Sequence, residues 1–135
     1  MIFSKTALLA MTLLVLTGCV TDTGKASGSG DGMANFDGTY RLVDIDGKAI
    51  PGNAVLNIDG QSMFGQAPCN SYTSQNNATW PQVSLAGIAS TRRACITEGG
   101  ESAYFAALEQ VAQASLSDGD LELRGPAHKM RFTAE

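Results

Sequence analysis

Three cysteines, one histidine and a few paired carboxylates are the side chains of this chain that could do chemistry. The cysteines are Cys19, Cys69 and Cys95, and the histidine is His128. A cysteine nucleophile needs a nearby base, and zinc needs cysteine and histidine ligands at short spacings. Because His128 follows a Gly-Pro-Ala turn far along the chain from every cysteine, we expect an exposed turn histidine, no catalytic residue and no metal site.

The carboxylates occur in loose pairs at expected turns. They are Asp44 with Asp46, Glu98 with Glu101, and Asp118 with Asp120. A calcium loop needs alternating oxygen ligands around a fixed glycine, and none of these segments has that pattern. Turn solvation and the favourable placement of negative charge at a helix N-terminus account for the pairs. We therefore expect neither acid–base catalysis nor a cofactor.

The first nineteen residues indicate that the chain is exported and where it is localised. Residues 1–5 contain the base Lys5, and residues 6–16 form an apolar run of eleven residues. A membrane-spanning helix needs about 20 apolar residues, so this run is typical of a signal peptide instead. It is followed by Leu16-Thr17-Gly18-Cys19, which resembles the lipobox of bacterial lipoproteins. An ordinary signal peptide with a chance cysteine is the alternative.

The lipobox resemblance implies that residues 1–18 are removed and that Cys19 is acylated on its thiol and on its new amine. Three acyl chains exceed the two signals that stable membrane anchoring requires. Val20 follows the cysteine where an aspartate would retain the protein in the inner membrane. The resemblance thus implies a lipid-anchored protein of the cell envelope, on the outer membrane and facing the periplasm.

Residues 19–35 are predicted to be the lipidated cysteine and a flexible tether. The segment 20–35 reads VTDTGKASGSGDGMAN and contains almost nothing to bury, so we expect it to be disordered. Sixteen residues of such a chain span about 20 to 25 Å on average. The following domain would stay near the membrane and turn freely.

Charge and length limit the class of partner that the chain can bind and the number of domains that it can form. From Cys19 onward the chain has eight Lys and Arg residues against thirteen Asp and Glu residues, a formal charge of −5. An acidic surface with scattered bases does not suit a phosphate backbone, so nucleic acid is excluded as a partner. With 135 residues the chain has room for one domain, and we expect a monomer.

Short alternating apolar runs separated by turn residues predict a β-rich domain over residues 36–135. We expect strands at 39–45, 54–59, 61–66, 71–79, 82–88, 89–95, 121–123 and 130–132. Apolar residues at helical spacing predict one helix over 101–116. The fold class is therefore mainly β, a small curled sheet or half-open barrel of about eight short strands with one helix, because such a sheet curls to protect its edges.

Two cysteine-containing segments indicate a particular protein family, whereas the periodicity indicates only a fold class. Residues 68–72 read Pro-Cys-Asn-Ser-Tyr, residues 85–95 read LAGIASTRRAC, and Glu101, Phe105 and Leu108 follow. With Tyr-Arg-Leu at 40–42, this pattern resembles the META domain, also called HslJ-like, over about residues 36–135.

The sequence departs from the META pattern at Tyr40, where tryptophan is usual, and at Arg93, where methionine is common. The resemblance implies a small β-barrel with a helix. It also implies an envelope lipoprotein, linked loosely to stress tolerance, secretion or motility. No catalytic activity comes with it.

Cys69 and Cys95 remain as an even pair once Cys19 is lipidated. In an oxidising envelope we expect them to form a disulfide that closes a loop of about 27 residues. The sequence leaves two alternatives open: a pair of buried thiols that only pack, or one reactive thiol.

Asn70, Tyr72, Thr91 and Arg92 are possible binding or structural residues, because they lie in the segments that carry the resemblance. We favour a structural role in which Asn70 holds a turn and Tyr72 packs in the core, with direct ligand contact as the alternative. Arg92 and Arg93 should point to opposite sides of an extended segment. At least one is then expected to be buried along its stem or paired with a carboxylate.

The function that we expect is binding or stabilising another envelope component, without catalysis. One hypothesis is a module that contacts an envelope protein. A second is a barrel that binds a small ligand or lipid in an apolar cavity. A third is a periplasmic protease inhibitor whose free N-terminal segment enters an active site.

Overall fold

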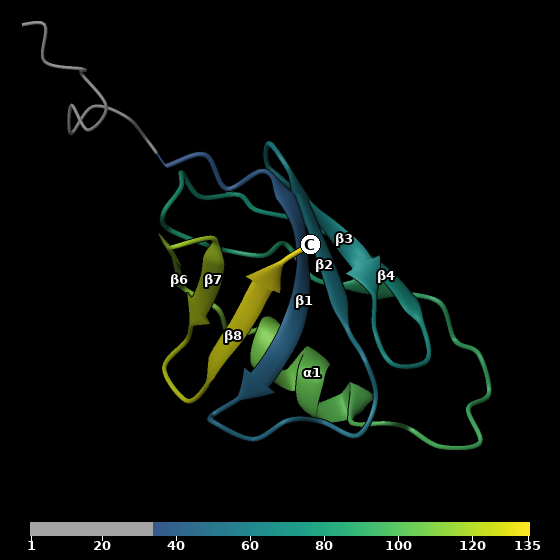
Figure 1. Cartoon of the computed structure of the whole chain (residues 1–135). Coiled ribbons are helices and arrows are strands. Elements are labelled where there is room, and N and C mark those ends of the chain that lie inside the picture. The colour runs from purple at the N-terminus through teal and green to yellow at the C-terminus, as the bar shows by residue number, and fades with distance from the viewer. Residues whose placement is uncertain (1–33) are drawn as a thin grey trace, which may run out of the picture.

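The computed structural model describes residues 34–135, so the predicted signal peptide, Cys19 and the tether up to residue 33 lie outside the described residues. The chain forms one antiparallel sheet with the strand order β5-β4-β3-β2-β1-β8-β7-β6 and one helix, α1 (Figure 1). The elements are β1 Gly38–Ile45, β2 Val55–Asp59, β3 Ser62–Gln66, β4 Ser71–Gln75, β5 Ala89–Ser90, α1 Glu101–Leu108, β6 Gln113–Ser117, β7 Asp120–Arg124 and β8 Lys129–Ala134. The predicted fold class, mainly β with about eight short strands and one helix, is confirmed.

Asp-Gly dipeptides reverse the chain as their chemistry predicts. Asp46 and Gly47 have φ values of 53° and 80°, and Asp118 and Gly119 have values of 52° and 86°. Two successive residues with positive φ form the tight turn whose twist suits antiparallel strands. The second of these turns joins β6 to β7.

The core lies between the sheet and α1, which is drawn beneath β1 and β8 in Figure 1. Along β7 and β8 the side chains alternate between buried and solvent-facing, as a pleated strand requires. Tyr104 and Leu108 of α1 are fully buried against this layer. The other large, fully buried apolar side chains are Leu56, Met63, Leu121, Leu123, Met130 and Phe132.

The helix is shorter than predicted. It ends at Leu108, and residues 113–117 form β6, which pairs with β7 so that Ala114 lies opposite Leu123. The predicted helical face over residues 109–116 is wrong because this segment alternates with period two: Ala114 is buried, while Gln113 and Ser115 are exposed. The Asp-Gly turn after it supplies a strand partner, and the ladder hydrogen bonds outweigh a weak helical preference.

The predicted strand over residues 82–88 is also wrong. This segment makes only isolated bridges, Asn76 with Leu85 and Gln82 with Gln113. The predicted strands over 71–79 and 89–95 are shortened to β4 and β5. The number of strands still agrees with the prediction because β6 replaces the strand expected at 82–88.

The two edges of the sheet differ in how they are covered. Residues 81–83 run along β6, where the Ala114 N–H donates to the Pro81 carbonyl at 2.8 Å and the Val83 N–H to the Ala112 carbonyl at 2.9 Å. Strand β5, at the other end of the sheet, has β4 as its one partner among the described strands. Among residues 34–135, no helix has the length and hydropathy of a membrane span.

Candidate functional site

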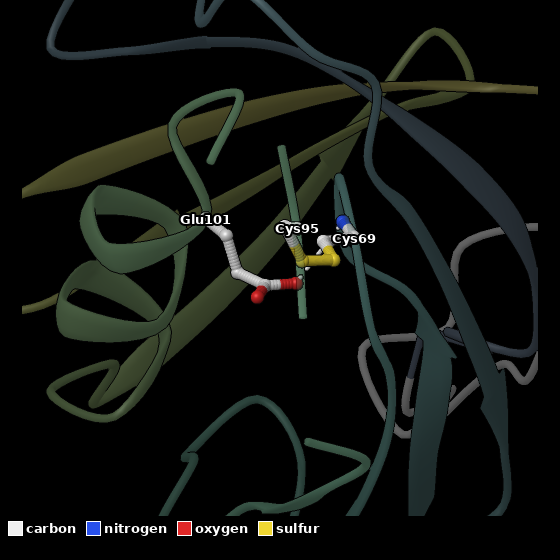
Figure 2. A group of neighbouring side chains, drawn as sticks. All are labelled: Cys69, Cys95 and Glu101. Atoms are coloured by element: carbon white, nitrogen blue, oxygen red, sulfur yellow. Dashed lines mark hydrogen bonds between the residues drawn. A yellow bond between two sulfur atoms is a disulfide. The ribbon is translucent and has the colours of Figure 1, made fainter. Parts of the chain in front are cut away.

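The two cysteines of the domain are joined in a disulfide whose Cα atoms lie 6.1 Å apart. Cys69 precedes β4, and Cys95 lies in the exposed segment between β5 and α1. Figure 2 shows the two sulfur atoms and, beside them, the side chain of Glu101 at the start of α1. Residues that are 26 positions apart in the sequence are thus held together next to the helix N-terminus.

Glu101 connects the helix to the β3–β4 connection. Its Oε1 accepts hydrogen bonds from the backbone N–H groups of Cys69 at 3.1 Å and Asn70 at 2.7 Å. Its Oε2 accepts one from Nδ2 of Asn70 at 2.7 Å. The side chain is buried, with a relative exposure of 9%. Three N–H donors and the positive end of the helix dipole compensate the buried negative charge.

Asn70 continues this network to the segment after β5. Its Oδ1 accepts hydrogen bonds from Oγ1 of Thr91 at 2.9 Å and from the backbone N–H of Arg93 at 2.7 Å. The hydroxyl of Thr91 accepts from the Ser71 N–H at 3.2 Å, and the Thr91 N–H donates to the Ser71 carbonyl at 3.0 Å. We call Asn70, Thr91 and Glu101 the polar clamp, because together they hold residues 91–93 against the start of β4.

Within the described residues, one group of three side chains brings possible metal-binding atoms close together: Cys69, Cys95 and Glu101. Their donor atoms lie within 4.8 Å of one another. In the disulfide, however, neither sulfur is a thiolate, which is the form that binds zinc. Both carboxylate oxygens of Glu101 also accept N–H groups. The arrangement suits a structural clamp better than a metal centre.

His128 lies at a turn between β7 and β8 and is half-buried. Its Nδ1 lies 2.7 Å from Oδ2 of Asp46, and this hydrogen bond lowers the pKa of the Asp46 carboxyl. The side-chain partner of His128 is therefore the carboxylate of Asp46, in the turn that follows β1.

Tyr72 and Tyr104 form a second buried polar pair. Tyr72 Oη donates to the Val55 carbonyl at 3.0 Å, so the hydroxyl of Tyr104, 2.5 Å away, must donate to Tyr72. Burial raises the pKa of both phenols well above the usual value. The pair joins α1 to the sheet and stays protonated at neutral pH.

Arg92 and Arg93 are both exposed, and neither forms an ion pair with a residue of the described part of the chain. The expectation that at least one would be buried or paired is wrong. Residues 91–94 lie beyond the end of β5 and are attached through the Thr91 hydroxyl and the Arg93 backbone N–H. This attachment uses the side chain of Thr91 and the backbone of Arg93, and both arginines are left exposed.

The surface around the arginines carries an exposed aliphatic side chain and two hollows. Ile96 is fully exposed, with a relative exposure of 104%. One hollow of about 320 Å³ is lined by Ser71–Thr73 and Ala89–Thr91. Another, of about 460 Å³, is lined by residues that include Cys69, Arg93 and Ile96. We call residues 89–97 the edge segment.

The sequence did not predict that Glu101 belongs to the polar clamp. From sequence, Glu101 is expected only to place a favourable negative charge at the helix N-terminus. Glu98 does have that role, because its Oε1 accepts the Ser102 N–H, and hydrogen bonds from the Ser102 hydroxyl and then from this N–H lower the pKa of the Glu98 carboxyl. The signal that was available for Glu101 was its place in the family pattern, one turn before an apolar helix face. Its partners lie 31 and 32 residues away in the sequence, so no local pattern could identify them.

Comparison with known proteins gives one family and two solved structures of similar fold. The family model described as META domain matches residues 33–135. An NMR structure of a protein from Burkholderia xenovorans is 23% identical, covers 73% of this chain and 82% of its own, and has a TM-score of 0.62. A second NMR structure is 15% identical, covers 72% of this chain and 88% of its own, and has a TM-score of 0.52. Both are similar in fold, and no curated protein matches the chain.

Proposed function

Because this chain belongs to the META domain family, we propose that it is an envelope lipoprotein whose domain binds another protein and catalyses no reaction. Lipid on Cys19 would anchor it to the outer membrane, facing the periplasm. The domain would act there as a monomer, in stress tolerance or secretion, and would need no cofactor.

The support for anchoring is the sequence before the domain. A basic start, an apolar run of eleven residues and Leu-Thr-Gly-Cys follow one another without a gap. The run is too short for a membrane helix and suits a signal peptide. The polar residues between Cys19 and the first described residue would then separate the domain from the lipid surface.

The observation that carries the binding function is the contrast between the polar clamp and the surface that it supports. In the described residues, every buried side-chain nitrogen and oxygen has a hydrogen-bond partner, so the clamp groups are engaged with one another and with the backbone. What they hold in place is exposed: two arginines that form no ion pair within residues 34–135, and a fully exposed isoleucine. Residues of this kind on a fixed segment favour recognition of a partner over chemistry.

The small-ligand alternative has less support. Tyr104 and Leu108 fill the space against the inner face of the sheet, and both are fully buried. One hollow with a largely apolar lining, about 320 Å³, lies outside this core between α1 and residues 45–51. The inhibitor alternative depends on the segment before residue 34, which lies outside the described residues.

Metabolic labelling with a palmitate analogue tests the anchoring. We expect the wild-type chain to carry label and to fractionate with the outer membrane. Cys19→Ser should lose the label and leave the outer-membrane fraction. Cys95→Ser is the matched control, because it removes a cysteine of the domain and should keep the label. An unlabelled wild-type chain in the soluble fraction would refute the proposal.

A further inference from the structure

Strand β5 is the last strand at one edge of the described sheet. Ser90 lies opposite Tyr72 and Ala89 opposite Thr73 on β4, and within residues 34–135 no strand pairs with the other side of β5. The Thr91 N–H bonds the Ser71 carbonyl, so the backbone groups of residues 89 and 91 face β4. Because successive residues of an antiparallel pair alternate, the backbone groups of Ser90 and Arg92 face away from the sheet.

This edge is held in shape before any partner arrives. The polar clamp holds Thr91 and the backbone of Arg93, and the disulfide fixes Cys95. A segment that is already ordered loses little conformational entropy on binding. The edge segment is therefore suited to receive an extended chain.

The side chains along the edge indicate which kind of chain would bind. Arg41, Arg124 and Arg131 each form an ion pair with a carboxylate of the domain. Arg92 and Arg93 do not, although the domain as a whole is acidic. Ile96, three residues further, offers an apolar contact. An acidic segment with apolar residues is complementary to this arrangement.

We propose that the edge segment binds an extended acidic segment of a partner protein, which adds a strand beside β5. Backbone groups of the partner pair with those of Ser90 and Arg92, and its carboxylates pair with Arg92 and Arg93. An apolar side chain of the partner covers Ile96. This inference rests on the proposed protein-binding function and names its site and the chemistry of its partner.

One other occupant, a second copy of this chain, is less compatible with the edge, and one alternative role of the arginines involves no occupant. A second copy that paired β5 with β5 would bring four arginines together, and such like charges repel. Charged residues also protect open edges against unwanted pairing. A purely protective role for Arg92 and Arg93 predicts that no acidic strand binds.

Peptides of defined charge test the proposal. The probes are two fluorescent peptides in which valine alternates with glutamate or, in the matched control, with lysine. Fluorescence anisotropy with the full-length chain in detergent should show binding of the glutamate peptide and none of the lysine peptide. The combined change Arg92→Glu and Arg93→Glu should weaken binding of the glutamate peptide at least about tenfold.

A matched control makes the same change in net charge at positions away from the edge. Arg41→Glu combined with Arg124→Glu changes the net charge equally, but at exposed positions on β1 and β7, and should leave peptide binding unchanged. Ser90→Pro removes an outward-facing N–H and should weaken binding several-fold while the Arg92 and Arg93 charges remain. Attraction by charge alone would not produce this loss.

Three results would overturn the proposal. They are equal binding of both peptides, equal losses in the two charge-reversed variants, and Arg92-dependent binding to vesicles of anionic lipid without peptide binding. The last result would assign the edge to a membrane surface. If the peptides fail while the Cys19-dependent anchoring is observed, the site is wrong and the lipoprotein assignment stands.

Discussion

Glu101 is the residue on which the polar clamp depends most. Its carboxylate is buried and accepts three N–H groups from two successive residues, Cys69 and Asn70. Hydrogen bonds to a charged group contribute about 1.5 to 3 kcal/mol each, and they are not additive. Loss of this one charge therefore affects the helix start and the edge segment together.

Glu101→Gln tests this dependence. The amide can accept at one oxygen, but its NH₂ group would face an N–H donor, so we expect a loss of about 2 to 3 kcal/mol in the free energy of unfolding. Urea denaturation measures it. Glu109→Gln, a change at an exposed position just after α1, is the control and should cost little. Equal stability of the two variants would show that Glu101 does not have the role assigned to it.

Asp44 is a second buried carboxylate, paired with Arg131 across β1 and β8, where Arg131 Nε lies 2.9 Å from Oδ2. This hydrogen bond lowers the pKa of Asp44. A group whose pKa is lower in the folded state stabilises the protein above its unfolded pKa, about 3.9 for aspartate, and this contribution is lost as the pH falls further.

Thermal unfolding of the wild type and of Asp44→Asn over a pH series tests this coupling. We expect the variant to be less stable at pH 7, and the difference to shrink below about pH 4. Asp59→Asn is the control, because Asp59 is exposed and its side chain bonds no other described residue. A difference between wild type and Asp44→Asn that stays constant down to low pH would contradict the assignment.

The sequence identified which residues matter better than it identified their hydrogen-bond partners. The cysteine pair and the importance of Asn70 followed from residue type and from the family pattern. The hydrogen-bond partners of Asn70 could not be predicted in this way, because Thr91 and Glu101 lie 21 and 31 residues away in the sequence. Hydrogen bonds between distant segments depend on register, which composition does not determine.

Among the elements, the strands bounded by tight turns were the most predictable. Asp-Gly turns and alternating apolar residues predict β1 to within one residue and place the centres of β7 and β8, although both strands extend beyond the predicted 121–123 and 130–132. β6 was assigned to the helix because Val111, Ala112 and Ser115 also satisfy helical spacing. Its assignment depends on pairing with β7, and short mixed sequences do not distinguish the two periods.

The disulfide is the element-scale constraint on the edge segment. Cys69 and Cys95 enclose a loop with a sequence separation of 26, and closing such a loop in the unfolded chain stabilises the fold by about 3 kcal/mol. Cys69→Ser combined with Cys95→Ser should lower the free energy of unfolding by that amount, measured by urea denaturation. A reductant should lower it equally in the wild type and leave the double variant unchanged. A wild type that ignores reductant would indicate free thiols.

The described part of the chain combines a filled core with one sheet edge that none of its other strands covers. Tyr104, Leu108 and the inner face of the sheet leave the interior occupied. Residues 81–83 cover part of β6, whereas within residues 34–135 nothing pairs with the outer side of β5 or forms an ion pair with Arg92 and Arg93. This asymmetry was not predictable from sequence, because it depends on which segments fail to become strands. It favours a protein partner at the β5 edge over a ligand inside the domain.

Native mass spectrometry of the protein taken from its own membrane tests this account most directly. After mild release of the domain from its anchor, we expect the mass of the polypeptide alone, with two hydrogens gained when the disulfide is reduced. The intact anchored form should begin at acylated Cys19. A domain that retains a mass of lipid size would place a ligand in the interior and contradict the account.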